Sequence, residues 1–264
     1  MPRFKLLIEY AGTRYSGWQI QKNARTVQGE IDRAIREGTK RREFELYGAG
    51  RTDAGVHALA QVAHLELYTD LAPEILRRRI NDELPPDIHI RSIVKAPHRF
   101  HARHDAVERS YLYQISTRRT AFGKPFVWWV REPLALETMR EAAAAFVGMR
   151  NFEAFTADDP EEKSTRVLVE AVEIEEQGAL ILVRIRGSHF LWKMVRRMVG
   201  VLAAVGRAEI PAVEAAAFLD PVRTAGARAT AAALAAPAAG LFLESVRYQG
   251  DPPIGRIRAV ISIE

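Results

Sequence analysis

The sequence contains no cysteine in its 264 residues. This absence excludes a disulfide framework, a thiolate-bound zinc or iron–sulfur site and a cysteine nucleophile. Any chemistry must therefore use Asp, Glu, His, Ser, Tyr or Lys. Long apolar segments are also missing, because the longest apolar run, residues 231–243, is dominated by alanine and broken by Pro237. We therefore expect neither a signal peptide nor a membrane span, and we expect a cytoplasmic protein.

Two motifs that hold phosphates or cofactors are absent as well. The glycine-rich segment 48–57 does not match the phosphate-loop pattern G-x-x-x-x-G-K-[ST], and it lacks the third glycine of the dinucleotide fingerprint. The histidines are not spaced as metal ligands. We therefore expect no metal, and a nuclease or phosphotransferase is disfavoured.

The sequence does contain an excess of basic residues that is unevenly spread. Residues 1–132 hold 23 basic and 16 acidic groups, a balance of +7, whereas residues 133–264 hold 15 and 17, a balance of −2. Arginine outnumbers lysine by 31 to 7. An arginine-rich half suits a polyanionic partner, because a guanidinium group pairs with phosphate through two hydrogen bonds. A GC-rich or thermophilic genome that uses arginine on solvated surfaces explains the same composition.

The order of the expected secondary-structure elements repeats along the chain. In the first half, helices are expected from Val27, with Thr26 as N-cap and Gly38 as stop, and from Pro73. The strands of that half are expected at residues 4–10, 44–47, 59–67 and 88–94. In the second half, helices are expected at 136–147 and 190–205. Its strands are expected at 107–116, 166–175, 180–186 and 241–248, with a last strand at 257–263.

Both halves therefore follow the order β-α-β-β-α-β. We expect an α+β fold of two related βαββαβ modules of the ferredoxin-like or RRM-like kind, residues 1–105 and 106–264. The first module carries the glycine-rich loop and the second carries insertions. Their antiparallel sheets, each with helices on one face, are expected to form a shared basic cleft.

The segment 48–57 combines three glycines with ionisable side chains in one turn. Glycine allows positive φ angles and a close approach of a ligand to the backbone. Arg51, Asp53 and His57 supply charged or titratable groups there. A turn in which Asp53 only hydrogen-bonds its own backbone gives the same pattern, so both interpretations stay open on the residues alone.

The expected strand 107–116 carries candidate binding residues. Arg109, Tyr111 and Tyr113 share one face of it, which is typical of a stacking platform for bases. A half-buried strand with ordinary aromatics is the alternative. Residues 95–131 hold eight Lys or Arg and two acidic residues, so the strand lies in the most basic part of the chain.

The expected helix 190–205 carries two adjacent arginines. Its apolar stripe predicts that Lys193 and Arg197 point into solvent, while Arg196 lies at the border of the core, on the same flank as Gly200. Such a position can hold a guanidinium fork against a carboxylate. By themselves, the two adjacent arginines are more typical of a solvated helix face.

The segment YGAGRTDAGVHA at residues 47–58 resembles the signature of the TruA family of tRNA pseudouridine synthases. Other family-like segments follow in the expected order, so the resemblance covers essentially the whole chain. They are Gly17-Trp18-Gln19, Phe100-His101-Ala102-Arg103, Arg109-Ser110-Tyr111-Leu112-Tyr113, Met194-Val195-Arg196 and Gly240-Leu241-Phe242-Leu243.

The resemblance implies an isomerase that converts uridine to pseudouridine at positions 38, 39 and 40 in the anticodon stem-loop of tRNA. It implies that Asp53 is the catalytic aspartate and Arg196 its basic partner. It implies further that Tyr111 stacks on the target uracil and that Arg51 contacts the substrate backbone and helps to extrude the base.

Further substrate contacts are implied for Arg109 and for Leu241 or Leu243, beside the uracil. The resemblance also implies a homodimer with the tRNA lying across both subunits, and no cofactor. A non-catalytic protein that binds structured RNA is the alternative from another class. Asp53 separates the two, because a carboxylate inside a cationic surface repels phosphate and gives a passive binder no advantage.

Overall fold

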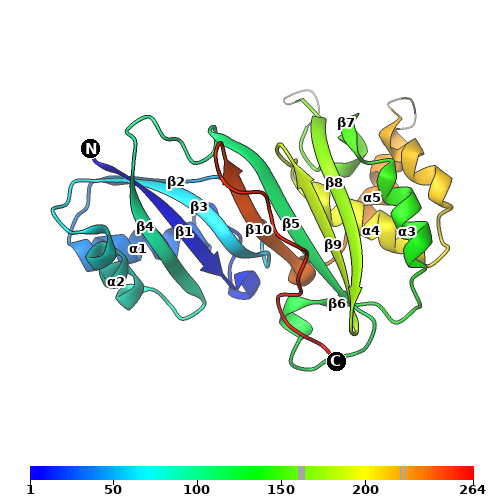
Figure 1. Cartoon of the computed structure of the whole chain (residues 1–264), viewed down its shortest axis with the longest axis horizontal. Helices are drawn as coiled ribbons and strands as arrows, with labels where there is room; N and C mark the ends of the chain where they lie inside the picture. The colour runs from blue at the N-terminus through cyan, green and yellow to red at the C-terminus, as the bar shows by residue number, and fades with distance from the viewer. Residues whose placement is uncertain (160–163, 221, 223) are drawn as a thin grey trace. The chain divides into compact units, whose positions relative to one another are not determined.

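The computed structural model describes residues 1–159, 164–220, 222 and 224–264. These residues form two compact units, one of Met1–Val107 with Phe242–Pro252 and one of Glu108–Leu241 with Pro253–Glu264. Both contain helices and mostly antiparallel strands (Figure 1), which confirms the predicted α+β class. Within the described residues, no helix is both long and apolar enough to span a membrane.

The first unit is built on the long strand β3. Its elements are β1 (Arg3–Tyr10), η1 (Gly12–Arg14), α1 (Val27–Thr39), β2 (Phe44–Gly48), β3 (His57–Leu67), α2 (Pro73–Glu83), β4 (Ile88–Ala96) and β10 (Leu241–Tyr248). One edge of β3 pairs with β1, which pairs in turn with β4. The other edge pairs with β2 antiparallel and, at His57 and Ala58, with β10 in parallel. The predicted elements of this half are confirmed to within a few residues.

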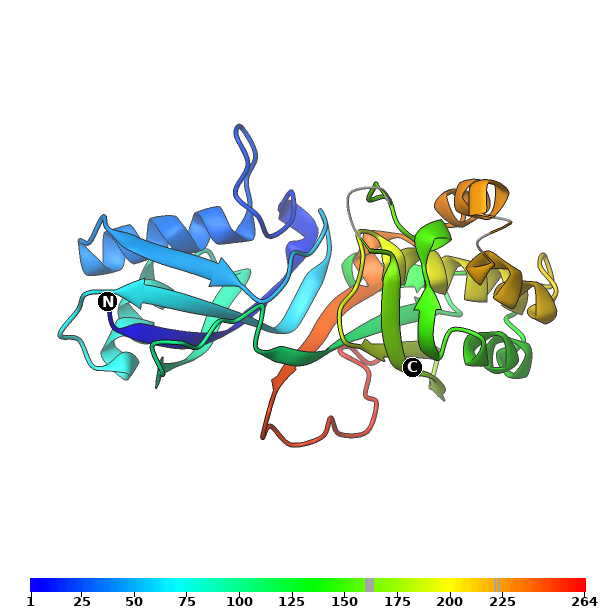
Figure 2. The same cartoon turned by 90° about the horizontal axis from the view of Figure 1, so that it is seen from above.

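The second unit is built on the hairpin β8–β9. Its elements are β5 (Ala106–Ser116), η2 (Lys124–Phe126), β6 (Trp128–Trp129), α3 (Leu136–Ala144), β7 (Gly148–Asn151), η3 (Glu153–Phe155), β8 (Arg166–Gln177), β9 (Leu180–Gly187), α4 (Met194–Gly206), η4 (Ala212–Leu219), α5 (Thr224–Ala233) and η6 (Ala238–Gly240). β9 pairs with β5 and β8, both antiparallel, and Gly178 turns the hairpin at φ 61°. The helices α3, α4 and α5 lie on one side of β8 and β9 (Figure 1 and Figure 2).

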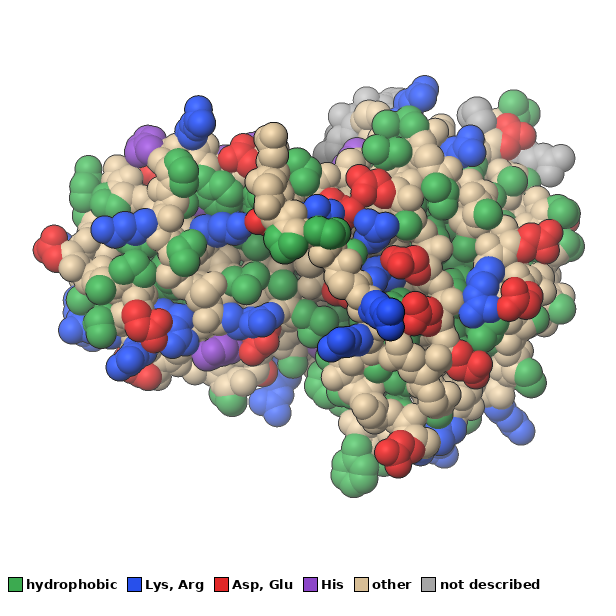
Figure 3. All heavy atoms as spheres, in the orientation of Figure 1, with side chains coloured by type: hydrophobic (Ala, Val, Ile, Leu, Met, Phe, Trp, Pro, Cys, Tyr) green, Lys and Arg blue, Asp and Glu red, His purple; other side chains and the backbone are tan. Residues whose placement is uncertain are grey.

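Oppositely charged side chains are interspersed over β8 and β9 of the second unit (Figure 3). Arg186 on β9 pairs with the buried Glu108 at 3.0 Å and approaches Glu173 on β8 at 3.5 Å. Arg184, which is 2% exposed, donates to the backbone oxygen of Gly255 at 2.9 Å. The buried charges are therefore paired with other charges or with backbone, as burial requires.

The predicted last strand at 257–263 is wrong. These residues, all of which the structure describes, have no strand conformation. The side chains of Gln114 and Gln177 bind the backbone of residues 257–263 instead. Gln114 accepts from the Val260 N–H at 2.6 Å. Gln177 accepts from the Ala259 N–H at 3.1 Å and donates to the Ile257 oxygen at 3.1 Å. The alternating apolar residues that suggested a strand do pack in the core, where Ile257 and Ile263 join a cluster with Leu112, Val127, Leu180 and Leu182.

The start of α1 is as predicted, but its end is not. The Thr26 side chain accepts from the Gly29 N–H at 3.2 Å, as expected of an N-cap. Gly38, predicted as the stop, lies inside the helix, which continues to Thr39, and Lys40 takes the left-handed conformation at φ 57°. The glycine is instead required by packing, since a Cβ on Gly38 would lie 2.5 Å from the Arg79 oxygen of α2.

We therefore expect opposite effects from alanine at two helical glycines. Gly38→Ala forces α1 and α2 apart and should lower the free energy of unfolding by about 1–3 kcal/mol. Gly226→Ala in α5, where a Cβ meets no atom within 4 Å, should raise it by about 0.5–1 kcal/mol. Denaturant unfolding of both variants tests this. Equal effects of the two substitutions would contradict the packing role of Gly38.

Candidate functional site

The loop between β2 and β3 is held by the segment that follows β1. The loop residue Thr52, which is buried, makes two hydrogen bonds: its Oγ1 shares one with the Tyr10 hydroxyl at 2.8 Å, and its backbone oxygen accepts from the Trp18 N–H at 3.0 Å. Gly55 donates its N–H to the Tyr15 oxygen at 3.2 Å. The two neighbours of the Asp53–Ala54 turn are thus both fixed to residues 10–18, which we name the clamp segment.

Glycines let the clamp segment approach this loop closely. Gly17 has φ +94°, and a Cβ there would lie 2.6 Å from the Thr52 oxygen. A Cβ on Gly12 would lie 1.9 Å from the Val56 oxygen. Trp18 fills the space above Gly48, whose Cβ would lie 2.6 Å from the indole Nε1. The close backbone approach excludes side chains at Gly12 and Gly17, and the Trp18 ring excludes one at Gly48.

Asp53 lies at the turn of this loop and is half-buried. Its backbone oxygen accepts from the Val56 N–H at 3.1 Å, and Gly55 takes φ +78°. Arg51 is exposed, and around Gly50 a Cβ would meet no atom within 4 Å. The loop therefore presents one carboxylate and one guanidinium group, from neighbouring positions, on a backbone that is anchored on both sides.

His57 closes the loop from the β3 side. The imidazole is 1% exposed, and its Nδ1 accepts the Gly12 N–H at 3.0 Å. Nδ1 therefore carries no proton, and the neutral ring is protonated on Nε2. The ring stacks on Phe242 of β10, with centroids 4.8 Å apart and an interplanar angle of 23°. Its position indicates an anchor of the loop.

The candidate residues Arg109 and Tyr111 lie on β5 in the second unit. Tyr111 is half-buried and meets the ring of Phe190 edge-on, with centroids 5.1 Å apart and an interplanar angle of 85°. Arg109 donates to the Ser188 oxygen at 2.7 Å. The predicted three-residue platform is wrong at Tyr113, which is fully buried and donates its hydroxyl to the Pro237 oxygen at 2.7 Å. Burial raises the pKa of Tyr113 well above its usual value, partly offset by the charge of Arg196.

The two arginines of α4 differ from expectation. Arg197 was predicted in solvent but is 6% exposed and donates to the backbone oxygens of Ala154 and Thr156. Burial, with a smaller effect of the Arg228 charge, lowers its pKa. The cause lies in α4 itself, which is apolar on almost every side and therefore buried all round.

Arg196, on the same helix, is half-buried and donates its Nε–H to the Ala236 oxygen at 2.7 Å, while the Ala236 N–H donates to the Arg196 oxygen at 2.9 Å. The segment before β10 is thus tied to α4. Gly200 of the same helix lets this segment approach closely, because a Cβ there would lie 1.9 Å from the Leu234 oxygen.

A family model described as tRNA pseudouridine synthase matches residues 6–105 and 142–249. The chain belongs to this family. Three relatives named tRNA pseudouridine synthase A are similar over nearly the whole chain. The protein of Pseudothermotoga lettingae is 36% identical over 94% of this chain and 100% of its own. That of Maricaulis maris is 38% identical over 95% and 99%. That of Rhodopseudomonas palustris is 39% identical over 94% and 100%.

As a tRNA pseudouridine synthase, the chain isomerises uridine to pseudouridine in tRNA. Within the matched residues lie both the loop with Asp53 and the helix with Arg196. Asp53 and Arg51 belong to the first unit, whereas Arg109, Tyr111 and Arg196 belong to the second.

The two leucine candidates lie on either side of the boundary between units. Leu241 is 5% exposed and belongs to the second unit, and Leu243 is 1% exposed and belongs to the first. Leu243 pairs with Ala58 of β3, next to the Phe242–His57 pair. Both side chains are thus apolar and largely buried.

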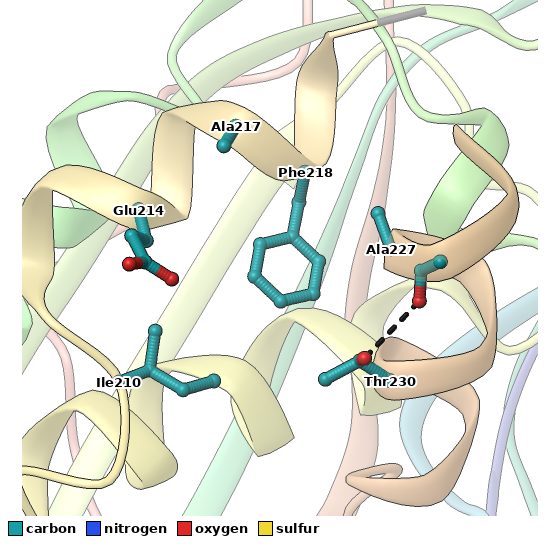
Figure 4. A pocket seen from close by; sticks show the side chains of 7 residues that line it. Ile210, Glu214, Ala217, Phe218, Ala227 and Thr230 are labelled. Atoms are coloured by element: carbon teal, nitrogen blue, oxygen red, sulfur yellow. Dashed lines mark hydrogen bonds between the residues drawn. The ribbon is translucent and has the colours of Figure 1, made fainter. Parts of the chain in front are cut away.

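The synthase also has a small hollow in its second unit, between η4 and α5 (Figure 4). Its volume is about 310 Å³, and Phe218 and Ile210 supply its apolar lining, with Glu214 and Thr230 as polar members. Thr230 donates its hydroxyl to the Gly226 oxygen at 3.1 Å. None of the residues that line this hollow is a predicted site residue, so we do not assign the catalytic site to it.

Sequence reasoning missed the anchors of the candidate site. Tyr10, Thr52 and His57 fix the loop, but their side chains gave no local signal of that role. The Gly17-Trp18-Gln19 segment carries a signal only through its resemblance to the family. The structure explains the glycine of this segment, because the backbone at Gly17 and Trp18 lies close to the Thr52 oxygen.

Proposed function

We propose that the chain is a tRNA pseudouridine(38–40) synthase that acts as a homodimer on uridines 38, 39 and 40 of the anticodon stem-loop, in the cytoplasm. The observation that supports it best is the loop of Asp53, a single carboxylate beside Arg51 on a backbone anchored at Thr52 and Gly55. Such rigidity suits a group that must meet one atom of an extruded nucleotide.

The reaction needs one well-placed carboxylate and no redox partner. The N1–C1′ bond of the target uridine breaks, and the same ring forms a C5–C1′ bond after rotation. The C5 hydrogen leaves as a proton and N1 gains one, so atoms and electrons balance. Asp53 serves by attack at C1′, by attack at C6 of the base, or by removal of a C2′ proton to give a glycal.

The other residues have supporting roles in this proposal. Arg196 pairs with Asp53 and favours its ionised form. Tyr111 stacks on the uracil, Leu241 or Leu243 lies on its other side, and Arg51 and Arg109 contact the RNA backbone. The RNA lies along a basic cleft formed by two βαββαβ modules, residues 1–105 and 106–264, and no metal or cofactor takes part.

The site of modification tests the proposal directly. Transcripts of one tRNA with uridine at 38, 39 or 40, and a matched transcript with cytidine at all three positions, are incubated with the protein. Carbodiimide treatment and primer extension then map pseudouridine. We expect modification at these positions and none in the cytidine transcript. Modification only outside the anticodon stem-loop would contradict the proposed specificity.

The clamp segment predicts a large effect of a small substitution. Gly17→Ala places a methyl group 2.6 Å from the Thr52 oxygen and must displace the loop that carries Asp53. A displacement of about 1 Å should lower kcat roughly 100-fold. Gly250→Ala is the matched control, because Gly250 has a similar φ of +88° but a Cβ there meets no atom within 4 Å. Both variants bear the same backbone strain, so equal kcat values would argue against the clamp.

A further inference from the structure

One face of the sheet in the first unit carries aromatic and charged side chains. Burial alternates along β1, so that Phe4, Leu6 and Ile8 lie on the apolar face and Lys5 on the other. Lys5 pairs across the strands with His64 of β3, and His64 pairs with Tyr47 of β2. Cross-strand neighbours share a face, so these residues form one row on the polar face.

Four rings gather on this face in a chain of contacts. Tyr47 stacks on His64, with centroids 5.2 Å apart and an interplanar angle of 24°. His64 meets His101 at 4.7 Å, and His101 meets His104 at 4.3 Å. We name these four side chains the ring surface. His64 is buried and forms its floor, whereas Tyr47 is 47% exposed and His104 is exposed.

Backbone hydrogen bonds keep two of the imidazoles neutral. The Nδ1 of His64 accepts the Ala102 N–H at 3.1 Å, and the Nδ1 of His101 accepts those of Arg103 at 3.1 Å and His104 at 3.3 Å. Burial, followed by the nearby His101 and Arg3, lowers the pKa of His64 to about 4. Burial and His104 also lower the pKa of His101. Above pH 7 the ring surface is therefore aromatic and uncharged at these two positions.

The charges around the ring surface bear on what it binds. Lys95, Arg99 and Arg103 are exposed on the segment that leads into it. Glu45 lies beside Tyr47, and its negative charge raises the pKa of the phenol. A phosphate at the ring itself would be repelled by this carboxylate, whereas a neutral base would not. Among the residues that the structure describes, no three His, Asp or Glu side chains are placed to hold a metal ion.

We propose that the ring surface stacks an unpaired base of the bound tRNA, outside the loop that carries Asp53. Exposed aromatic rings with cations near them are the usual means of holding a splayed base while the backbone is neutralised nearby. The family already supplies tRNA as the ligand, and the neutral rings select a base over a phosphate. The ring surface thus acts as a second RNA contact that adds affinity without touching the reacting uridine.

Exposed tyrosines provide a matched test. Tyr47→Ala removes the ring, Tyr47→Phe keeps it, and Tyr68→Ala removes a tyrosine that is 63% exposed elsewhere in the same unit. Binding of full-length tRNA to each variant is measured by fluorescence anisotropy at several salt concentrations. Thermal unfolding confirms that each variant is folded, and kcat is measured at saturating tRNA.

We expect Tyr47→Ala to raise Kd roughly 5- to 150-fold, the range for loss of one stacked base. Tyr47→Phe and Tyr68→Ala should stay within about twofold of wild type. The slope of log Kd against log salt should not change, since stacking neutralises no phosphate. The kcat of Tyr47→Ala should stay close to that of wild type.

Three results would overturn this proposal. A Kd for Tyr47→Ala within twofold of wild type would show that no base stacks there. A shallower salt slope would indicate a phosphate contact instead. A sedimentation coefficient of the Tyr47→Ala protein without tRNA that differs from that of wild type would indicate that the ring surface is an interface between copies of this chain. The binding assay does not depend on modification at positions 38–40, so its failure is distinct from failure of the proposed function.

Discussion

Asp53→Asn should abolish pseudouridine formation and leave the affinity for tRNA within a few fold of wild type. The amide keeps the size and much of the hydrogen bonding of the carboxylate, but it neither attacks carbon nor accepts a proton at neutral pH. Loss of a group that acts on the reacting atoms lowers turnover by roughly 1,000-fold or more. Single-turnover formation of pseudouridine and tRNA binding are measured on the same protein.

A substitution in the same loop provides the control for Asp53→Asn. Ala54 is exposed and follows Asp53 directly, so Ala54→Ser changes the loop surface without removing the carboxylate. This variant should keep most of its turnover. An equal loss of binding and activity in Asp53→Asn would count against a chemical role and would favour a passive RNA-binding protein.

Tyr111→Ala should lower turnover strongly in a protein that stays folded. In the proposed site its ring stacks on the uracil and restricts water, and base–aromatic stacking contributes about 1–3 kcal/mol per base. If the transition state loses the same stacking free energy, kcat/KM falls roughly 5- to 150-fold. Initial rates with tRNA, together with thermal unfolding, measure the two effects.

Two further variants distinguish the contribution of the Tyr111 ring from that of its hydroxyl group and from that of its packing against Phe190. Tyr111→Phe keeps the ring and should retain most of the rate. Phe190→Leu removes the edge-on contact at 5.1 Å that orients the ring, and it should give an intermediate loss. A near-normal rate for Tyr111→Ala would remove this residue from the stacking role.

Local sequence signals predicted most element boundaries because they depend on short-range chemistry. The Thr26 cap, the proline that starts α2 and the two strands of the β8–β9 hairpin are all found within a few residues of where they are expected. The failures share a different cause, which is tertiary contact. The local sequence predicts Gly38 as a helix stop, but the residue is small because it contacts Arg79 of α2, and no local pattern reveals that contact.

Burial around the candidate site was the hardest property to predict. Strand alternation placed Tyr113 on an open face, whereas contacts from η6 and Pro237 cover it. Amphipathic reasoning placed Arg197 in solvent, although the continuous apolar sequence after it indicates a helix buried all round. Asp53 and Arg51 needed the family resemblance, because a glycine-rich turn has the same local signature with or without a catalytic role.

The measurement that tests the central claim most directly is tritium release from tRNA labelled with [5-³H]uridine. Formation of the C5–C1′ bond expels the C5 hydrogen, so each isomerisation releases one label to water. We expect release by the wild-type protein without added metal and with the tRNA strand intact, and none above background by Asp53→Asn. Strand cleavage without tritium release, or release by Asp53→Asn at the wild-type rate, would contradict the account.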